Sequence, residues 1–440
     1  MRPIEKAPPW FKDEYYSKAI SLRKKDPRIN DLIEKINQEY LYWDRVKYQK
    51  APGKISPEII WILTKLSRVL SGKKLSFGKY KFTYNLTDII QKGLHEFDLH
   101  IGGDLGATTV VPAEDKNRYL VSSIMEEAIA SSQIEGAVTT RRKAKEMLRK
   151  NIRPRNKSEQ MIVNNYRTIK YIVDIQNEPI TAERLFEIHR LIVNRTLEDP
   201  HDEGKYRSDN EVNVIDAADN EVVYTPPDFK EVASLMKDLF VFFNSNDEKQ
   251  FIHPIIKGCI IHFMIGYIHP FVDGNGRTAR ALFYWYLLKN GYWLTEYLSI
   301  SRLIVKSKVQ YAKAYVYTET DDNDLTYFLI YKIKTMQLAY ADLKSYIQSK
   351  IKEKKHLIAF QKIEGINERQ AFILKWMHDE PDIILTIKEI ETRFNISNQT
   401  ARTDLTTLQK MGYLETMGLD KKTKAFYKSA EFEKLLKKVL

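Results

Sequence analysis

The segment from Ile268 to Arg280, IHPFVDGNGRTAR, combines residue types that suit chemistry on a phosphate group. Its two glycines let the backbone turn so that successive N–H groups point at one anion, beside the positive end of the helix that we expect to follow. Arg277 and Arg280 are three residues apart and therefore share a face of the first helical turn. Guanidinium groups in that position clamp neighbouring phosphates. The segment therefore predicts a phosphate-binding loop at a helix N-terminus.

Two other residues of this segment supply functional groups for a reaction. Asp273 is the one carboxylate in the loop, and its expected use is to hold a Mg²⁺ ion that is shared with phosphate oxygens. His269 ends an apolar helix, where outward carbonyls favour imidazolium, so we expect a pKa near neutrality and a general base. A base beside phosphates deprotonates a hydroxyl that attacks one of them, which predicts transfer of a phosphorus-containing group. The alternative is a glycine-rich turn with two surface arginines and a capping histidine, but nine specified residues in order argue against it.

The elements that must position these residues are mostly helical. The apolar run from Cys259 to Val272 is too short to cross a bilayer and predicts a core helix. In contrast, EVNVIDAADNEVVYTPP alternates apolar and polar residues around residues 218–220 and stops at two prolines. This pattern predicts a hairpin that rests on helices, because an isolated hairpin is marginally stable. The N-terminal region, with INDLIEKINQEYLYWDRV and SPEIIWILTKLSRVL, has helical periodicity and a helix start at Pro57.

The sequence HPFVDGNGRTAR resembles the signature of the Fic family, H-P-F-x-[DE]-G-N-G-R-x-x-R, and departs from it at no fixed position. The resemblance extends over roughly residues 164–291 through GKYR at 204–207, the hairpin, and HPIIKGCIIHFMIGYIHPF. It implies a mainly helical Fic-type core with a β-hairpin flap. It also implies ATP with Mg²⁺, and transfer of AMP to a Ser, Thr or Tyr hydroxyl of a target protein with release of pyrophosphate. D-G-N-G-R, rather than the A-N-K-R of kinase-like relatives, favours AMP transfer over phosphorylation, although other family members use other donors.

The resemblance also implies a role for each residue of the loop. His269 becomes the base and Asp273 the Mg²⁺ ligand, while Phe271 packs to fix the loop. Arg280 serves the γ-phosphate, and Arg277 the phosphates nearer the transferred group. The hairpin becomes a flap that pairs with the backbone of the target, which is recognition by strand addition. The remaining implied contacts are Gly274, Asn275 and Gly276 around the α- and β-phosphates, and Val212, Val214, Val222 and Tyr224 on the flap.

A second pattern lies in SSQIEG, at the end of a helix expected over about residues 116–136. Without context Glu135 is a charged residue near a helix C-terminus, which is an unfavourable place for an anion. The stretch is similar to the inhibitory motif of the Fic family, [ST]-x-x-x-E-[GN], with Ser131, Glu135 and Gly136 in register. The resemblance implies that Glu135 pairs with Arg280, so that ATP cannot bind in its reactive pose. In some relatives the same glutamate positions a water that removes AMP, and the sequence leaves that activity open.

The C-terminal region from Ile366 onward predicts a helix-turn-helix followed by a wing, and it resembles winged-helix domains of bacterial regulators. The two helices are expected in TIKEIETRF and NQTARTDLTTLQKM, and a strand pair in GYLETMGLDKKTKAFYKS. Lys421, Lys422 and Lys424 of the wing are candidates for phosphate contacts, and we expect DNA as the partner, with protein binding as the alternative. The candidate base-reading residues are Asn398, Gln399, Thr400 and Arg402.

The whole sequence of 440 residues has a net charge of +12, a pI near 9.2 and a mean hydropathy of −0.44. Such a charge suits an anionic partner but equally a generally basic surface. The single cysteine, the absence of an apolar N-terminal region and the absence of a long apolar run predict a cytoplasmic protein without a membrane segment. The oligomeric state is left open, homo-oligomers included. We divide the chain into an N-terminal helical region (1–110), a catalytic domain (111–345), a helical linker (346–365) and the winged helix (366–440).

Three functions are compatible with these patterns. The first is an autoinhibited protein AMP-transferase that its C-terminal domain docks to DNA or to a target. The second is a DNA-binding transcription regulator that senses ATP with little or no turnover, and the third is a phosphotransferase, which the loop disfavours. The intact His269 favours the enzyme, because a pure sensor needs no base. A zinc site is not indicated, since His253, His262 and His269 lie nine and seven residues apart without a cysteine partner, and His262 is expected to be a core residue.

Overall fold

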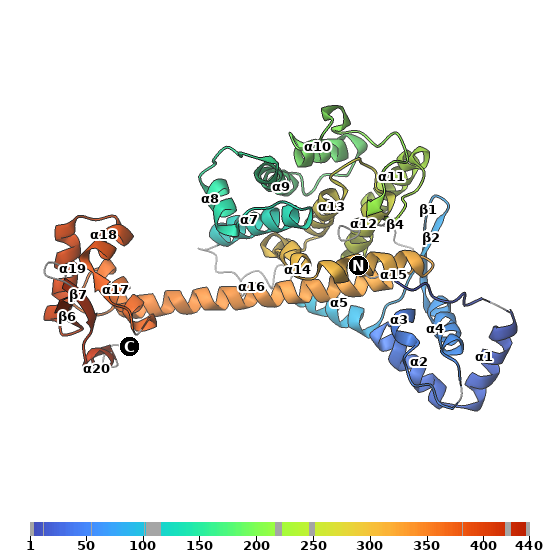
Figure 1. Cartoon of the computed structure of the whole chain (residues 1–440), viewed down its shortest axis with the longest axis horizontal. Coiled ribbons are helices and arrows are strands. Elements are labelled where there is room, and N and C mark those ends of the chain that lie inside the picture. The colour runs from blue at the N-terminus through green and yellow to red at the C-terminus, as the bar shows by residue number, and fades with distance from the viewer. Residues whose placement is uncertain are drawn as a thin grey trace. The chain divides into compact units, whose positions relative to one another are not determined.

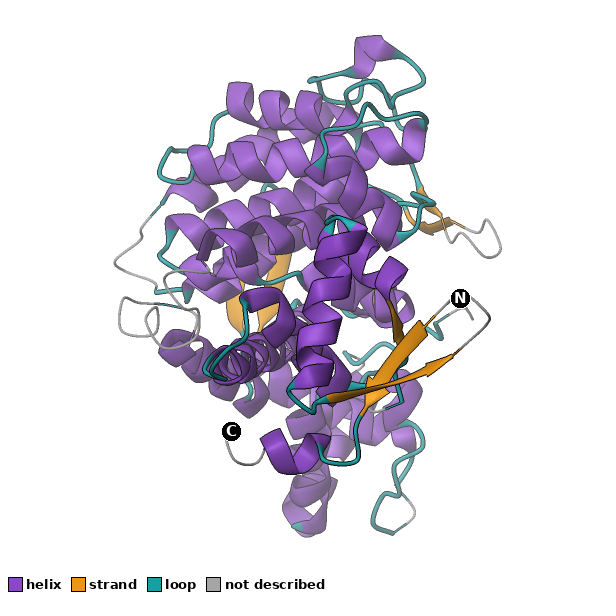
Figure 2. Ribbon diagram, turned by 90° about the vertical axis from the view of Figure 1, so that its left-hand side faces the viewer, coloured by secondary structure: helices purple, strands orange, loops and turns teal. Residues whose placement is uncertain are grey.

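The computed structural model describes residues 4–11, 13–53, 55–100, 102, 116–215, 222–245, 251–380, 382–418 and 424–436. The chain is mainly helical, and its few strands form three small sheets (Figures 1 and 2). The mainly helical fold class predicted from the sequence is confirmed. The chain divides into two compact units, Met1–Leu343 and Lys344–Leu440. The boundary between them lies within α16, a helix that runs unbroken from Thr326 to Gln361. No helix in the described ranges is long and apolar enough to cross a membrane.

The N-terminal part of the first unit is helical except for one hairpin that the sequence reasoning missed. Strands β1 (Lys73–Phe77) and β2 (Tyr80–Tyr84) pair in antiparallel register, with Phe77 opposite Tyr80. The two-residue turn begins at Gly78, whose φ of 53° favours glycine. The predicted helix start at Pro57 is present, as the first residue of α4. The helices of this part are α1 (Asp13–Lys25), α2 (Arg28–Glu39), α3 (Trp43–Val46), α4 (Pro57–Ser71) and α5 (Asp88–His100).

The rest of the first unit is built around two helices, α12 (Pro254–Ile268) and α13 (Asn275–Lys289), which pack against each other. Nearly every side chain of both is buried, because other helices cover them on all sides. The short loop between them therefore has a rigid support at each end. The surrounding elements are α7 (Lys116–Ile134), α8 (Arg141–Arg149), α9 (Lys157–Asp174), α10 (Ala182–Val193), η2 (Pro200–Asp202), β3 (Val214–Ile215), β4 (Val222–Tyr224), α11 (Phe229–Asn244), η3 (Trp293–Tyr297), α14 (Ile300–Lys306), α15 (Lys308–Thr320) and the first part of α16.

The predicted hairpin within the helical domain is present as the antiparallel pair β3–β4, with an irregular register between residues 214 and 215. The turn expected at residues 218–220 lies outside the described residues.

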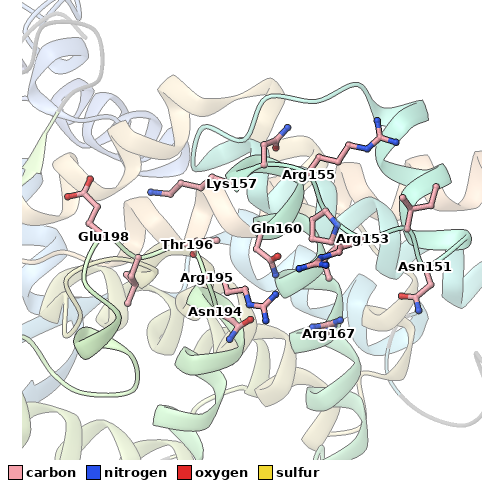
Figure 3. A pocket seen from close by; sticks show the side chains of 15 residues that line it. Asn151, Arg153, Arg155, Lys157, Gln160, Arg167, Asn194, Arg195, Thr196 and Glu198 are labelled. Atoms are coloured by element: carbon pink, nitrogen blue, oxygen red, sulfur yellow. The ribbon is translucent and has the colours of Figure 1, made fainter.

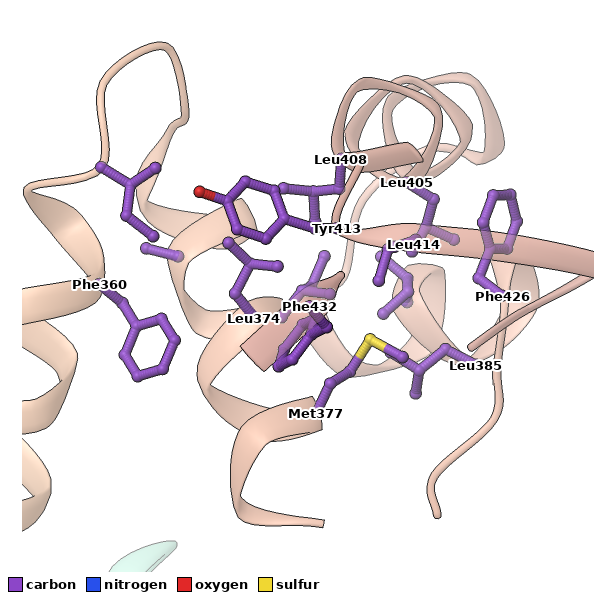
Figure 4. Close-up of a cluster of buried hydrophobic side chains, with 14 of the residues drawn as sticks. Phe360, Leu374, Met377, Leu385, Leu405, Leu408, Tyr413, Leu414, Phe426 and Phe432 are labelled. Atoms are coloured by element: carbon purple, nitrogen blue, oxygen red, sulfur yellow. The ribbon is translucent and has the colours of Figure 1, made fainter. Parts of the chain in front are cut away.

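The second unit contains α17 (Glu368–Asp379), β5 (Leu385–Thr386), α18 (Ile387–Phe394), α19 (Asn398–Lys410), β6 (Leu414–Gly418), β7 (Lys424–Lys428) and α20 (Phe432–Leu436). Helices α18 and α19 are joined by a three-residue turn in which Asn395 is left-handed, with a φ of 52°. The strands form one antiparallel sheet in the order β5-β7-β6. A continuous apolar core joins these elements (Figure 4), and Leu374, Leu405 and Phe426 bring α17, α19 and β7 together in it.

Candidate functional site

The loop between α12 and α13 is held by its own side chains. His269 caps α12 in the left-handed region, with φ 51° and ψ 59°, and Gly274 precedes α13 with a φ of 88°. Asn275 closes the loop, because its Oδ1 accepts from the Phe271 N–H (2.9 Å) and its Nδ2 donates to the Phe271 carbonyl (2.7 Å). The sequence placed Asn275 among the phosphate contacts. Its buried side chain instead fixes the loop, which leaves the backbone N–H groups at the start of α13 to face an anion.

The Arg277 side chain is turned inward, and its phosphate contact stays a prediction. Its Nη2 lies 3.1–3.2 Å from both carboxylate oxygens of Asp273, and its Nη1 donates to the Ile192 carbonyl at 3.0 Å. The guanidinium is almost fully buried, whereas the Asp273 side chain is 46% exposed. Arg277 therefore ties the loop to α10 and sets the direction of the Asp273 carboxylate.

His189 of α10 is a site residue that the sequence reasoning missed. Its ring stacks on Phe271 with centroids 3.8 Å apart, its Nδ1 accepts from the Gly204 N–H at 3.0 Å, and its Nε2 donates to the Asp273 carbonyl at 2.9 Å. Burial lowers the pKa of His189 to about 4, so the ring is neutral and keeps both hydrogen bonds. Its signal was a single histidine in the apolar pattern LFEIHRLIV, which does not reveal a partner 84 positions away.

Arg207, in the GKYR stretch, holds the backbone of the histidine. Its Nε donates to the His269 carbonyl at 2.9 Å, and its N–H donates to the Pro270 carbonyl at 2.9 Å. Its Nη1 donates to the Asp209 carbonyl at 2.7 Å, and its Nη2 to the Pro227 carbonyl. Arg207 thus joins the left-handed turn at His269 to both ends of the segment that carries the hairpin.

The environment of the His269 ring differs from the sequence expectation. The helix-end argument predicted a pKa brought up to neutrality, but burial lowers the pKa of His269, against the effect of the Gly266 carbonyl. That carbonyl lies 3.3 Å from Nδ1, which favours the tautomer with the proton on Nδ1. The ring is then neutral at pH 7 and Nε2 carries the lone pair. A neutral ring with this tautomer can accept a proton at Nε2.

His269 lines a cavity of about 450 Å³, together with Gly276 and Arg280 from α13. The facing wall is a row of side chains from α15, which includes Tyr311 and Tyr315. The cavity is large enough for a nucleotide-sized ligand.

The structure brings Ser131, Glu135 and Arg280 together. Arg280 Nη2 donates to Glu135 Oε1 (2.9 Å) and to the Ser131 carbonyl (3.0 Å), and its Nε donates to Ser131 Oγ (2.8 Å). A Cβ placed on Gly276 would lie only 2.3 Å from Glu135 Oε1. The carboxylate therefore rests on the first turn of α13, where an anion is favoured. Gly136, with a φ of 88°, lets the chain turn away directly after Glu135.

Three polar contacts hold the end of α7 in this position. Asn165 Nδ2 of α9 donates to Ser132 Oγ at 2.8 Å, and the Val138 N–H donates to Ser158 Oγ at 3.0 Å. Lys308 Nζ donates to the Gln133 carbonyl at 2.8 Å. The position of Glu135 is thus set by α9 and α15 as well as by Arg280.

Only some of the hairpin residues selected from the sequence line the cavity. Val214 and Tyr224 line the cavity with His269, and the Tyr224 hydroxyl donates to the Tyr267 carbonyl at 3.0 Å. Val222 is 57% exposed and Val212 is half-buried, and neither lines the cavity. Val223, which the sequence reasoning did not select, does line it.

The C-terminal residues selected from the sequence lie at the start of α19. Asn398 donates to Glu391 Oε2 at 2.9 Å, and Thr400 is half-buried beside the cap residue Ser397. Gln399 and Arg402 are exposed. Asp404 of the same helix is buried and accepts from Arg369 Nε at 2.8 Å. Lys424 is exposed at the start of β7, and Lys421 and Lys422 lie outside the described residues.

The two histidines that the sequence analysis weighed as metal ligands, His253 and His262, have other partners. His253 Nε2 lies 3.0 Å from Asp98 Oδ2. His262 is fully buried, with Tyr311 Oη 2.8 Å from its Nε2 and Lys332 Nζ 3.3 Å from its Nδ1. No cluster of three or more potential metal ligands occurs among the residues with assigned positions.

Comparison with known proteins identifies the middle of the chain. Residues 179–287 match the Fic/DOC family. Two curated relatives named Protein adenylyltransferase Fic are each 33% identical to this chain. The one from Nematostella vectensis aligns over 117 residues, which are 27% of this chain and 25% of that protein. The one from Drosophila virilis aligns over 118 residues, which are 27% of this chain and 22% of that protein. The aligned part thus spans about a quarter of the length of these relatives.

The fold of a solved Fic family protein from Desulfovibrio desulfuricans G20 is also similar. It superposes with a TM-score of 0.51 at 20% identity, over 80% of this chain and 99% of that one. The match of residues 179–287 to the Fic/DOC family and the similarity of fold both agree with the resemblance that the loop signature indicated.

Proposed function

We propose that this protein transfers AMP from ATP to a hydroxyl side chain of a target protein and releases pyrophosphate. The observation that carries the proposal is that His269, Gly276 and Arg280 line one cavity of about 450 Å³. A base, a helix N-terminus for phosphates and a guanidinium are therefore within reach of one bound nucleotide. The names of the curated relatives support the same reaction.

The chemistry follows from the positions of these groups. The α13 N-terminus and the loop N–H groups hold the phosphates, and Arg280 binds the end of the triphosphate. Neutral His269 accepts the proton of the target hydroxyl as its oxygen bonds to the α-phosphorus. The bond between the α-phosphorus and the bridging oxygen breaks, and pyrophosphate leaves with that oxygen. Arg207 acts as a positioning residue, since it holds the His269 carbonyl in place.

Asp273 fits the Mg²⁺ that this reaction implies. One exposed carboxylate beside a phosphate loop is a suitable donor set, because Mg²⁺ keeps several waters and takes its other ligands from substrate phosphates. Bound there, the ion would neutralise charge on the phosphate oxygens. Asp273 is held by Arg277 in the direction of the loop, so the protein supplies the orientation.

We further propose that Glu135 inhibits the enzyme in two ways. It occupies the guanidinium of Arg280, and its carboxylate takes up the space above Gly276 that a phosphate oxygen needs. Ser131 reinforces the inhibited state by two more bonds to the same arginine. The hairpin is the proposed docking strand for the target, because Val214 and Tyr224 border the cavity that holds the base.

A DNA-binding regulator that senses ATP is the second candidate. Helices α18 and α19, their short turn and the β6–β7 hairpin have the order of a winged helix, and Gln399 and Arg402 are exposed on α19. We propose that this domain binds DNA, with protein binding as the alternative.

A labelling experiment distinguishes the two functions. Wild type, Glu135→Gly, and Glu135→Gly with His269→Ala are incubated with Mg²⁺ and ATP labelled on the α-phosphate, alone and with a lysate of the source organism. We expect label on protein only with Glu135→Gly. No label in any sample, with ATP binding intact, would replace the transferase by the ATP-sensing regulator. Label from γ-labelled ATP instead would indicate a phosphotransferase.

A further inference from the structure

A second cavity lies in the first unit, away from the Fic loop (Figure 3). Its volume is about 820 Å³, and none of its lining residues belongs to the catalytic cavity. Its walls are the segment 151–157 between α8 and α9, one face of α9, and the segment 194–198 between α10 and η2. Residues 151–156 connect α8 to α9, and residues 194–198 connect α10 to η2.

The residues that line this cavity carry an excess of positive charge. Five of its residues are cationic, and the single carboxylate is Glu198. None of the five forms an ion pair with a carboxylate anywhere in the described ranges. Some other surface cations of this unit do have such partners, as Lys143 has in Glu159. The cationic residues are Arg153, Arg155, Lys157, Arg167 and Arg195.

Three of the arginines converge. Figure 3 shows the side chains of Arg153, Arg167 and Arg195 directed toward the middle of the cavity around Gln160, while Arg155 and Lys157 point outward. Like charges held this close repel one another unless an anion lies between them. Arg195 also has a left-handed backbone, with a φ of 56°, which is unfavourable for an arginine. Neither the clustered charges nor this backbone conformation stabilises the fold. A bound anion would account for both.

The composition of the walls narrows the chemistry of that ligand. No aromatic residue lines the cavity, so it has no surface on which a base could stack. Guanidinium groups match phosphate oxygens in geometry and form charge-assisted bonds with them. A chain of phosphates places several charges within one cavity, whereas the carboxylates of a peptide are separated by backbone. We propose that this cavity binds a condensed phosphate chain, either as a free polyphosphate or as the phosphate tail of a nucleotide.

The experiment measures binding and its location together. Hydrogen exchange and calorimetry are recorded with sodium tripolyphosphate at constant ionic strength. We expect slower exchange in residues 151–157 and 194–198, separately from any effect on residues 269–280. Replacing Arg153, Arg167 and Arg195 by glutamine should weaken binding at this site at least about tenfold and abolish the protection, since each lost bond is charge-assisted. A control variant with glutamine at Arg142, Arg149 and Lys170 loses the same charge outside the cavity and should behave as wild type.

Other outcomes are equally decisive. Arg195→Gly removes one of the three arginines without destabilising the backbone, because glycine accepts a φ of 56°. This variant should also weaken tripolyphosphate binding. Protection by tripolyphosphate alone identifies free polyphosphate as the ligand, and additional protection by ATP identifies a nucleotide tail. No protection at the two segments, equal losses in the cavity and control variants, or protection only by single-stranded RNA would overturn the proposal.

Discussion

Replacing Glu135 separates the two ways in which it is proposed to inhibit the enzyme. Glycine removes both the ion pair with Arg280 and the atom that lies over Gly276. Glutamine keeps the atom and removes the charge. Comparing the two variants therefore shows whether ATP is excluded by competition for the arginine, by occupied space, or by both.

The structure sets the size of the expected effect. Arg280 is 3% exposed and Glu135 32% exposed, and one hydrogen bond of 2.9 Å joins them. A hydrogen bond to a charged group contributes about 1.5–3 kcal/mol, and partial exposure of the carboxylate favours the lower half of that range. Since about 1.4 kcal/mol is tenfold in affinity, losing this competition should tighten ATP binding about 10–30-fold. Glycine should exceed this value, because it also frees the space above Gly276, and glutamine should reach only part of it.

The assay is calorimetric binding of an ATP analogue with a methylene bridge between its α- and β-phosphates, followed by the rate of AMP transfer. Glu146→Gln, at an exposed glutamate of α8, serves as a control and should match wild type. Equal affinity for the analogue in wild type and both Glu135 variants would refute the competition with Arg280. Affinity for Glu135→Gln as high as for Glu135→Gly would refute the contribution of occupied space.

Three further predictions concern other parts of the chain. Burial lowers the pKa of Lys332 from 10.5 to about 8, so the folded state binds fewer protons than the unfolded state between these pH values, and the free energy of unfolding should rise by about 3 kcal/mol as pH increases through them. In urea unfolding, Lys332→Met should lose this pH dependence, whereas Lys334→Met, at an exposed position of the same helix, should keep it. Arg207→Met in the Glu135→Gly background should slow AMP transfer about tenfold or more with little change in ATP affinity, because the His269 backbone loses its hydrogen bond; an unchanged rate would contradict its positioning role. Alanine at Gln399 or Arg402 should weaken binding to a selected DNA site by about 1–3 kcal/mol in a mobility-shift assay, and unchanged affinity in both would favour a protein partner for α19.

The sequence was most informative where function lies in one continuous segment. The order of residues from His269 to Arg280 predicted a turn between two helices, because glycine, asparagine and flanking apolar runs act locally. It did not reveal that Asn275 points inward or that Arg277 is buried, since both directions depend on Phe271 and on the Ile192 carbonyl of another helix.

Features made by distant segments were missed for the same physical reason. His189 was not selected, because only the fold shows that its ring stacks on Phe271. Strands β1 and β2 were assigned to a helical region although KKLSFGKYKFTY alternates in part, since strong helical patterns flank it on both sides.

The contacts around α7 bear on how the proposed inhibition by Glu135 would be released. Outside Arg280, polar contacts to Asn165, Ser158 and Lys308 hold the end of the helix. Each such bond contributes only about 1 kcal/mol net, so these contacts outside Arg280 add a few kcal/mol to the stability of this position. A binding partner that contacts α7, α9 or α15 can supply that amount. If Glu135 inhibits as proposed, we expect a partner of this kind to release Arg280 from it.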